Sequence, residues 1–305
     1  MPSASEVWSV HDAAEAIAQA AAGGQRVTID REGGDVVLSL SRFDQVLEHE
    51  AGDLTCTVEA GLRLEDLNAR LAEHGQMFSL DPPGNPTIGA CIAGDLSGPR
   101  RHRYGTARDL LLGVTVVLGD GTIASSGGKV VKNVAGYDLG KLFCGSAGKL
   151  GLIARASLRL HPGPESARTL VAPVEDAADA QRMAQAVLSS TLVPSAVDLI
   201  WPGWLAVLFE GGGRAVAAQM EAARALLGGT EDFGGVWDEA AARQEWAQGR
   251  LAFAPGRLAE TLVEHPEAIV RVGAGVAYVP QPVPAESNPL AERVRAEFDP
   301  QGVFA

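Results

Sequence analysis

The fold is decided by the stretch Gly94-Asp95-Leu96-Ser97-Gly98-Pro99-Arg100-Arg101-His102-Arg103-Tyr104-Gly105. This stretch is rich in glycine and arginine, although the chain as a whole is acidic. Two more glycine-rich turns flank it, at residues 82–89 and 145–151. Glycine allows backbone N–H groups to approach a ligand closely, so three such turns together predict a cradle for an anion or a cofactor. Taken alone, each is more typical of an ordinary tight turn.

The composition indicates a globular protein of two domains. The chain has 305 residues, of which 46% are hydrophobic and 21% are charged, so it can bury a substantial core. Its net charge of -13 argues against a nucleic-acid-binding surface, because binding to phosphate backbones depends mainly on lysine and arginine.

Only three cysteines occur, Cys56, Cys91 and Cys144, and no two of them form a C-x-x-C pair. This spacing excludes a self-contained iron–sulfur or zinc site of the usual kind and gives no disulfide framework. We therefore expect no metal and a reducing, cytoplasmic environment. We also expect neither a signal peptide nor a transmembrane segment.

Hydrophobic periodicity predicts alternating strands and helices in the first half. The clearest signals are a helix at Val10–Ala22 with Asp12 as its N-cap, and a hairpin at Asp120-Gly121. Strands are predicted at 26–30, 36–40, 54–59, 109–119 and 151–160, an amphipathic helix at 63–74, a helix or strand at 87–93, and a helical turn at 139–144.

Pro162-Gly163-Pro164 predicts a linker between two domains. The residues that follow read as strand, helix, two strands, helix and strand, an order typical of a ferredoxin-like α+β sandwich. The predicted strands are 168–172, 196–199, 205–210, 269–272 and 276–279, and the predicted helices are 176–189, 214–227 and 288–298. The fold class is therefore α+β.

The short motifs become informative as an ordered set. They are Pro82-Pro83-Gly84, Thr87-Ile88-Gly89, Leu96-Ser97-Gly98-Pro99-Arg100-Arg101, Tyr104-Gly105, Arg108-Asp109, Lys132-Asn133-Val134-Ala135-Gly136-Tyr137-Asp138-Leu139 and Gly145-Ser146-x-Gly-x-Leu150-Gly151. This set resembles the PCMH-type FAD-binding domain of the vanillyl-alcohol-oxidase family, most clearly between Cys56 and Pro162. The third and sixth motifs resemble the subfamily of E subunits of bacterial glycolate oxidases.

The resemblance implies a two-part FAD-binding domain at residues 1–162, with subdomains at about 1–50 and 51–162, and a smaller ferredoxin-like cap domain at 163–305. It implies that FAD binds non-covalently and carries the redox chemistry, while the protein positions it. The residues carried over for the flavin and diphosphate are Pro83, Gly84, Thr87, Ile88 and Gly89; those for the isoalloxazine side are Gly94, Asp95, Leu96, Ser97, Gly98, Tyr104 and Gly105; those for the adenine-ribose end are Ala147, Gly148, Leu150, Gly151 and Ile153.

Departures from the family pattern leave the binding of FAD open. Relatives have a glycine- and serine-rich phosphate loop between the first two strands, whereas the turn here is Asp30-Arg31-Glu32-Gly33-Gly34-Asp35. Its three carboxylates would repel a diphosphate. Asp95 stands where relatives often have asparagine, and Ala90 replaces the second glycine of the usual pair. A cofactor-free scaffold that keeps the fold for assembly is therefore the first alternative.

No residue is identified as a catalytic base, although oxidation of a 2-hydroxy acid needs a base for the hydroxyl proton. The Glu-His-Gly-type motif of catalytic relatives has its nearest match in Glu264-His265-Pro266, where His265 is better explained as a solvated residue at a helix end. His102 is the remaining candidate, and its alternative is a neutral, surface-exposed histidine. A stand-alone 2-hydroxy-acid dehydrogenase is the second alternative.

Four arginines of the central stretch have three candidate roles: to bind a substrate carboxylate, to neutralise the phosphates of the cofactor, or to pair with a partner subunit. They are Arg100, Arg101, Arg103 and Arg108. The plainer alternative is a surface loop neutralised by the chain's own carboxylates.

Three further features also have structural explanations. Lys132, Asn133 and Asp138 are expected to fix a turn. The tail 298–305 resembles the family's end, where a segment crosses back onto the FAD domain. Four tryptophans fit either a recognition face or a buried core; they are Trp201, Trp204, Trp237 and Trp246.

The resemblance thus implies an accessory FAD-binding subunit of a glycolate oxidase complex, an oxidoreductase that acts on CH–OH groups. A sister flavin subunit would oxidise glycolate to glyoxylate, and an iron–sulfur subunit would carry the electrons onward. We expect a cytoplasmic hetero-oligomer that contacts the inner membrane only through its partners.

Overall fold

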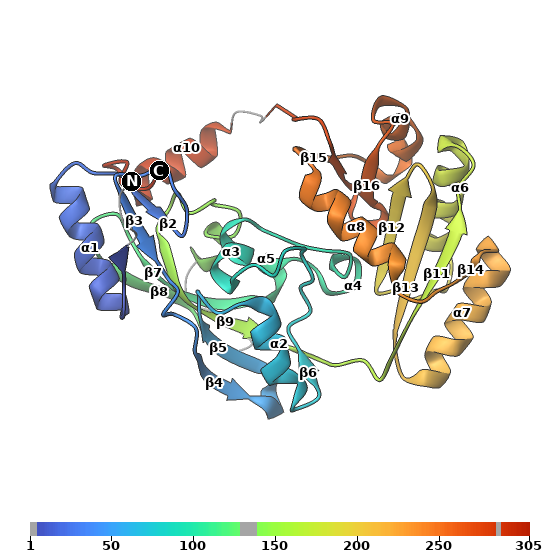
Figure 1. Cartoon of the computed structure of the whole chain (residues 1–305), viewed down its shortest axis with the longest axis horizontal. Helices are drawn as coiled ribbons and strands as arrows, with labels where there is room; N and C mark the ends of the chain where they lie inside the picture. The colour runs from blue at the N-terminus through green and yellow to red at the C-terminus, as the bar shows by residue number, and fades with distance from the viewer. Residues whose placement is uncertain (1–4, 129–138, 285–287) are drawn as a thin grey trace.

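The computed structural model describes residues 5–128, 139–284 and 288–305 (Figure 1). It has two halves, each with its own sheets and its own hydrophobic core. The glycine- and arginine-rich stretch lies between them, because its short helix α4 (Arg101–Tyr104) points from the first half towards the second.

A small parallel sheet with strand order β1-β3-β2 begins the first half. Its strands are β1 (Ser5–Glu6), β2 (Val27–Ile29) and β3 (Val36–Ser39), and helix α1 (Val10–Ala22) packs beside them. The helix bounds are as predicted, but the predicted cap is wrong. Ser9 is the N-cap, and its side chain accepts a hydrogen bond from the N–H of Asp12.

A five-stranded antiparallel sheet with order β4-β5-β9-β7-β8 forms the second part of the first half. Its strands are β4 (Val46–Glu50), β5 (Thr55–Glu59), β7 (Leu111–Val117), β8 (Ile123–Gly127) and β9 (Leu152–Arg159). The hairpin predicted at Asp120-Gly121 joins β7 and β8 and is confirmed. The ambiguous segment 87–93 is a helix, α3 (Ile88–Ala93), because the side chain of Thr87 caps its first turn.

Shorter elements complete the first half. They are η1 (Ala51–Asp53), α2 (Leu64–Ala72), β6 (Gln76–Met77), α5 (Ala107–Leu110), η2 (Leu139–Leu142) and β10 (His161–Pro162). Helix α2 buries Leu64, Leu67 and Leu71, as its periodicity predicts.

One seven-stranded sheet organises the second half, with order β14-β11-β13-β12-β16-β17-β15. Its first four positions have the antiparallel arrangement of a ferredoxin-like unit, with α6 and α7 as the two helices. The elements are β11 (Ser166–Pro173), α6 (Ala177–Leu188), β12 (Ala196–Trp201), β13 (Trp204–Gly211), α7 (Gly213–Leu227), β14 (Thr230–Asp232), α8 (Gly235–Trp246), β15 (Gly249–Ala252), η3 (Pro255–Arg257), α9 (Leu258–Glu264), β16 (Ala268–Arg271), η4 (Val272–Ala274) and β17 (Val276–Val279).

The fourth strand of the ferredoxin-like order is β14, so its expected position at 269–272 is wrong. Residues 269–272 contribute instead to β16, which extends the sheet on its other side. Helix α8 and strand β15 were not predicted. Only Val236 and Ala240 of α8 are buried, so its sequence shows little apolar periodicity.

The two faces of the large sheet have different coverings. Helices α6, α7 and α9 cover one face and build the main core of this half. Helix α8 lies on the other face over Val171, Ile200 and Ile269. This second face looks towards the first half, since the Gln244 side chain of α8 donates to the backbone oxygen of Ser97 at 3.1 Å.

The C-terminal segment crosses back onto the first half. Helix α10 (Pro289–Phe298) lies beside the first half in Figure 1, and Phe298 packs edge-on against Phe143 at 5.7 Å. The carboxylate of Asp299 accepts the N–H groups of Val303 and Phe304, which holds the tail beside β2. We retain the proposed domain boundary after Pro162, with residues 289–305 packed on the first domain. Among the described residues, no helix has the length and apolar character needed to cross a membrane.

Candidate functional site

A groove of about 310 Å³ lies between the small parallel sheet, helix α3 and the turn 145–151. Its walls contain small residues from the segments that the sequence singled out, together with residues that it did not. The predicted members are Gly89, Gly94, Ala147, Gly148, Gly151 and Ile153; the others are Val27, Thr28, Ile29, Asp30, Arg31, Leu40, Ala90, Ala93, Phe304 and Ala305. The structure therefore brings residues of all three glycine-rich segments together.

The turn 145–151 is shaped by positive φ angles. Ala147 has φ 53° and Gly148 has φ 76°, and the N–H of Ala147 donates to Ala93 at the end of α3. A Cβ on Gly148 would meet no atom within 4 Å, whereas a Cβ on Gly151 would lie 2.8 Å from the Val117 oxygen. Gly151 is thus required by close packing of the protein itself, and Gly148 keeps the groove open.

The chemistry of the groove fits a dinucleotide. Thr28 lines its wall, and the Thr28 hydroxyl is buried without a hydrogen-bond partner among the described residues. The hydroxyl of Ser146 is likewise buried without such a partner, but Ser146 lies outside the lining of the groove. Two of the three carboxylates that the sequence places in the turn after β2 accept backbone N–H groups, Asp30 from Leu40 and Asp35 from Arg26. These bonds hold both carboxylates against the backbone of the small sheet without removing their charge, so the repulsion expected from this turn stays a prediction.

The other residues that the family resemblance implies for the cofactor are not among the described lining residues of the groove. The side chains of Ile88 and Leu150 belong to the hydrophobic core, and Thr87 caps α3. Ser97 is buried, and its hydroxyl accepts a hydrogen bond from Arg101. Pro83 lines a second cavity. Gly84, Gly98 and Gly105 lie in loops, where Gly84 and Gly105 have positive φ angles. Asp95 has φ 46°, and one of its carboxylate oxygens is buried without a partner among the described residues. Leu96 keeps 36% of its surface exposed, and Tyr104 packs against His161. The cofactor contacts of all these residues remain predictions.

The second cavity, of about 550 Å³, lies between the two halves. Its lining carries three arginines and four carboxylates, namely Arg100, Arg168, Arg271, Asp81, Glu210, Glu231 and Asp232. Each arginine is paired: Arg100 with Glu210, Arg168 with Glu231, and Arg271 with the buried Asp198. The lining therefore holds no excess of positive charge.

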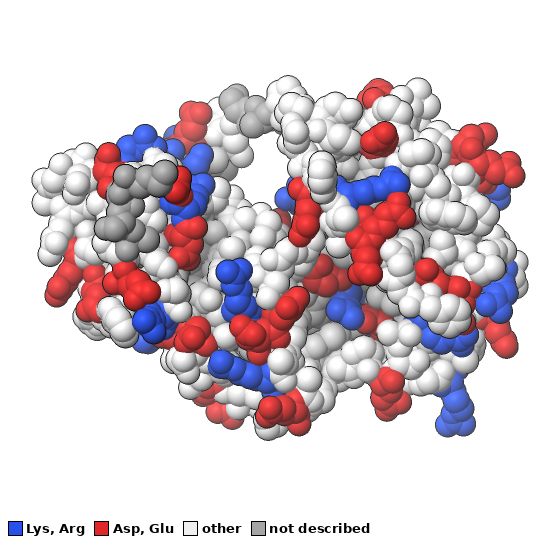
Figure 2. Space-filling model, in the orientation of Figure 1, with Lys and Arg blue, Asp and Glu red and all other residues white. Residues whose placement is uncertain are grey.

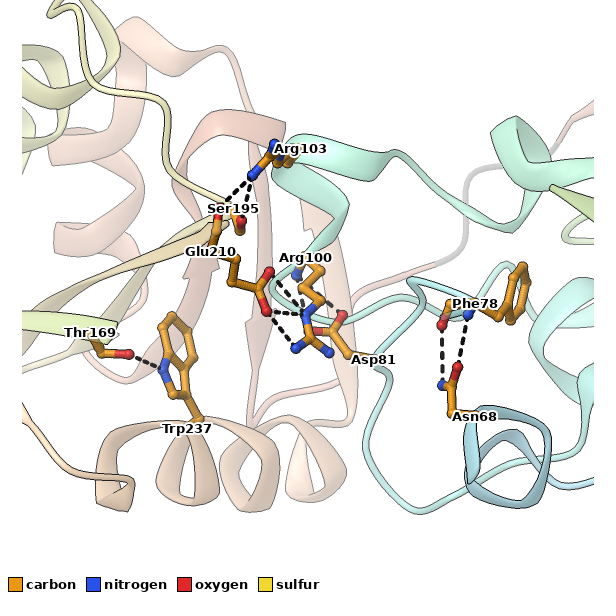
Figure 3. A network of polar contacts seen from close by, with 9 residues as sticks. All are labelled: Asn68, Phe78, Asp81, Arg100, Arg103, Thr169, Ser195, Glu210 and Trp237. Atoms are coloured by element: carbon orange, nitrogen blue, oxygen red, sulfur yellow. Dashed lines mark hydrogen bonds and ion pairs between the residues drawn. The ribbon is translucent and has the colours of Figure 1, made fainter. Parts of the chain in front are cut away.

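The arginine loop joins the two halves (Figure 3). Arg100 donates through Nε and Nη2 to the Glu210 carboxylate on β13, with a shortest distance of 2.6 Å. Arg103 donates to the Ser195 hydroxyl and to the backbone oxygen of Glu210. The plainer alternative, pairing with the chain's own carboxylates, is therefore correct for Arg100, whereas Arg103 bonds to a hydroxyl and to a backbone oxygen. The surface position expected for this loop is wrong, because the side chain of Glu210 is 0% exposed.

The remaining polar residues of the loop differ from these two. Arg101 donates to Ser97 within the loop, and Arg108 is exposed. His102 is half-buried rather than surface-exposed, because it packs against Gly273, where a Cβ would lie 2.1 Å from its Nδ1. Burial lowers the pKa of His102, so the histidine is neutral, as expected.

Asp81 holds the arginine loop in place through the backbone of Arg100. The backbone N–H of Arg100 donates to its carboxylate, and a Cβ on Gly98 would lie 1.9 Å from its backbone oxygen. Burial raises the pKa of Asp81 to about 7, although Arg100 and Arg271 lower it in part. This carboxyl group was not predicted from the sequence, since nothing local marks it as buried.

Other predicted features lie outside both cavities or outside the described residues. Lys132, Asn133 and Asp138 belong to residues 129–138, which the structure does not describe. His265 caps the C-terminal end of α9. Trp237 donates to Thr169 (Figure 3) and Trp201 is half-buried, whereas Trp204 and Trp246 are 44% and 83% exposed. On the face shown in Figure 2, acidic side chains spread over both halves, with lysine and arginine at separate places between them.

Comparisons with known proteins agree with this geometry. Residues 4–127 match the family described as an FAD binding domain. The chain is 33% identical over 197 residues to "Glycolate oxidase subunit GlcE" of Escherichia coli, covering 64% of this chain and 55% of that protein. It is 35% identical over 175 residues to "Glycolate oxidase subunit GlcD" of Bacillus subtilis, covering 57% and 37%. It is 37% identical over 171 residues to the mitochondrial "D-lactate dehydrogenase [cytochrome] 1" of Saccharomyces cerevisiae, covering 56% and 29%. The chain thus spans about half or less of the length of these relatives.

The fold comparison covers nearly the whole chain. The structure superposes on that of an alkyldihydroxyacetonephosphate synthase with a TM-score of 0.72 and 16% sequence identity, covering 98% of this chain and 74% of the other. At this identity the likeness shows the shared fold alone.

Replacing Arg100 by alanine should destabilise the protein strongly, because it leaves the fully buried Glu210 carboxylate without its partner. Breaking a buried pair in this way typically costs about 3 to 5 kcal/mol. Urea unfolding of Arg100→Ala and of Arg257→Ala, whose exposed partner is Glu260, measures the difference. The control should change little. If Glu210→Gln added to Arg100→Ala recovers no stability, the buried charge is not the cause.

The raised pKa of Asp81 predicts a pH-dependent stability. The folded protein binds its proton more tightly than the unfolded chain, so this contribution is fully present below about pH 4 and is lost as pH rises through about 7. The loss is at most about 4 kcal/mol. Urea unfolding between pH 4 and 8 should show a smaller decline with pH in Asp81→Asn than in the wild type, and no such change in the exposed control Asp66→Asn. Parallel pH profiles for wild type and Asp81→Asn would contradict the assignment.

Proposed function

We propose that the protein is the accessory FAD-binding subunit of a glycolate oxidase complex, because residues 4–127 match an FAD binding domain and the chain is similar to a glycolate oxidase subunit. In this role it contributes to the oxidation of glycolate or a related 2-hydroxy acid. The observation that carries the proposal is the groove, where small residues from separate segments meet and where Thr28, whose hydroxyl is buried without a partner among the described residues, forms part of the wall. The likeness to the two glycolate oxidase subunits supports the choice of complex.

The residues of the groove would hold the cofactor between two walls. Gly89 and Gly94 of the α3 region form one wall, and Ala147, Gly148 and Gly151 form the other. When bound, FAD supplies the acceptor for two electrons. The protein contributes the shape of the groove and the small side chains that let a dinucleotide approach the backbone.

The charges between the two halves support an accessory role. A carboxylate substrate needs an unpaired cation, but each arginine of the interdomain cavity already has a carboxylate partner. The described lining carries four carboxyl groups and three arginines, so it offers an added anion no excess of positive charge. We therefore place the oxidation of the 2-hydroxy acid in a sister subunit, with an iron–sulfur subunit as the onward electron carrier, and we expect the complex to lie in the cytoplasm.

The purified protein should bind FAD, and Gly148→Val should abolish binding because its side chain would enter the groove. A matched control is Gly228→Val, since Gly228 has a similar φ of 71° and equally open surroundings but lies at the end of α7. Visible absorption after incubation with FAD and dialysis measures the bound flavin. Equal loss in both variants would indicate backbone strain instead. A wild type that stays colourless would favour the cofactor-free scaffold.

The purified chain alone should not oxidise glycolate or D-lactate with an artificial electron acceptor, whereas a preparation with its sister subunits should. Dye reduction under both conditions measures this difference. Turnover by the chain alone would favour the stand-alone dehydrogenase and contradict the accessory role. If that turnover were lost in His102→Ala, His102 would become the candidate base.

A further inference from the structure

Strand β2 contains a residue with a buried hydroxyl, Thr28, close to the turn 30–35. Thr28 is 3% exposed, and its Oγ1 has no hydrogen-bond partner among the described residues. Thr28 is also one of the residues that line the groove. A buried hydroxyl without a partner is energetically unfavourable, so it indicates a group that is supplied when a ligand binds.

Arg31 lies three residues further on and supplies a positive charge to the same groove. Among the described residues that line the groove, it is the only lysine or arginine. Its Nη2 donates to the backbone oxygen of Ala305 at 2.5 Å, the one hydrogen bond that its side chain makes with described residues. A guanidinium has five N–H donors, so further donors remain for a ligand.

None of the three acidic residues of the turn 30–35 forms an ion pair with Arg31 among the described residues, although Glu32 is exposed directly beside it. The Asp30 carboxylate accepts the N–H of Leu40 at 2.9 Å, and the Asp35 carboxylate accepts the N–H of Arg26 at 2.8 Å. Both interactions follow from the parallel pairing of β2 with β3, which brings the turn back along the start of β2. Each carboxylate is therefore held by the backbone of the sheet, and the guanidinium is available to an anion.

We propose that Thr28 and Arg31 bind the diphosphate of the dinucleotide through a hydroxyl and a guanidinium, in place of the main-chain donors of a glycine-rich loop. A diphosphate matches these groups because it offers acceptor oxygens to both and is charged. Arg31 also holds the tail through Ala305, so the bound diphosphate and the tail share one side chain. This inference rests on the proposed binding of FAD.

The test compares ligands with and without phosphate. Equilibrium dialysis would measure binding of FAD and of riboflavin to the wild-type chain and to Arg31→Ala, Arg31→Lys and Thr28→Val. Charge-assisted hydrogen bonds of this kind correspond to roughly tenfold to a hundredfold in affinity. We expect Arg31→Ala to weaken FAD by about that factor, Arg31→Lys and Thr28→Val to weaken it less, and riboflavin binding to stay unchanged. Arg26→Ala is the matched control, since Arg26 is exposed at the start of the same strand and outside the lining of the groove.

The outcomes separate this inference from the proposed function. A wild type that binds neither ligand would overturn the cofactor assignment itself. Unchanged FAD affinity in Arg31→Ala, or equal losses for FAD and riboflavin, would overturn the diphosphate site while leaving the FAD assignment standing. A loss for FAD alone, larger at low than at high salt, would support it.

Discussion

The buried ion pair between Arg100 and Glu210 is the interaction on which the arrangement of the two halves depends. The carboxylate lies on the large sheet without exposure, and the guanidinium comes from the first half. A charge removed from water in this way needs a partner with good geometry, and Arg100 donates through two nitrogen atoms. Gly98 is needed to bring the loop there, because any side chain would collide with Asp81.

This pairing divides the molecule into two sites with different chemistry. The groove belongs to the first half together with the tail, and its lining includes Arg31. The interdomain cavity has its arginines already paired within the chain. Arg100 and Arg103 of the arginine loop join the two domains, whereas the roles of Arg101 and Arg108 towards a cofactor or a partner stay predictions.

Local patterns were sufficient for the parts of the fold that local chemistry determines. Helix α1 and the hairpin at Asp120-Gly121 were predicted because apolar periodicity and turn residues specify them. Strand β14 was missed because it has only three residues, and helix α8 was missed because only two of its twelve residues are buried. Within the groove, the glycine turns were found for the same local reason. Thr28 was missed because an ordinary strand residue becomes informative only when its hydroxyl is seen buried without a partner.

The partners of the arginines could not be predicted, because the sequence states that a charge exists but not which distant group balances it. Arg100 reaches a carboxylate 110 positions along the chain, and Arg31 reaches a backbone oxygen 274 positions away. With a net charge of -13, acidic groups exceed basic ones, so an arginine placed inside readily finds a carboxylate. Positive charge then remains for a ligand only where the nearby acids are held by backbone N–H groups. In the described groove Asp30 and Asp35 beside Arg31 are held in this way, whereas Glu32 is exposed.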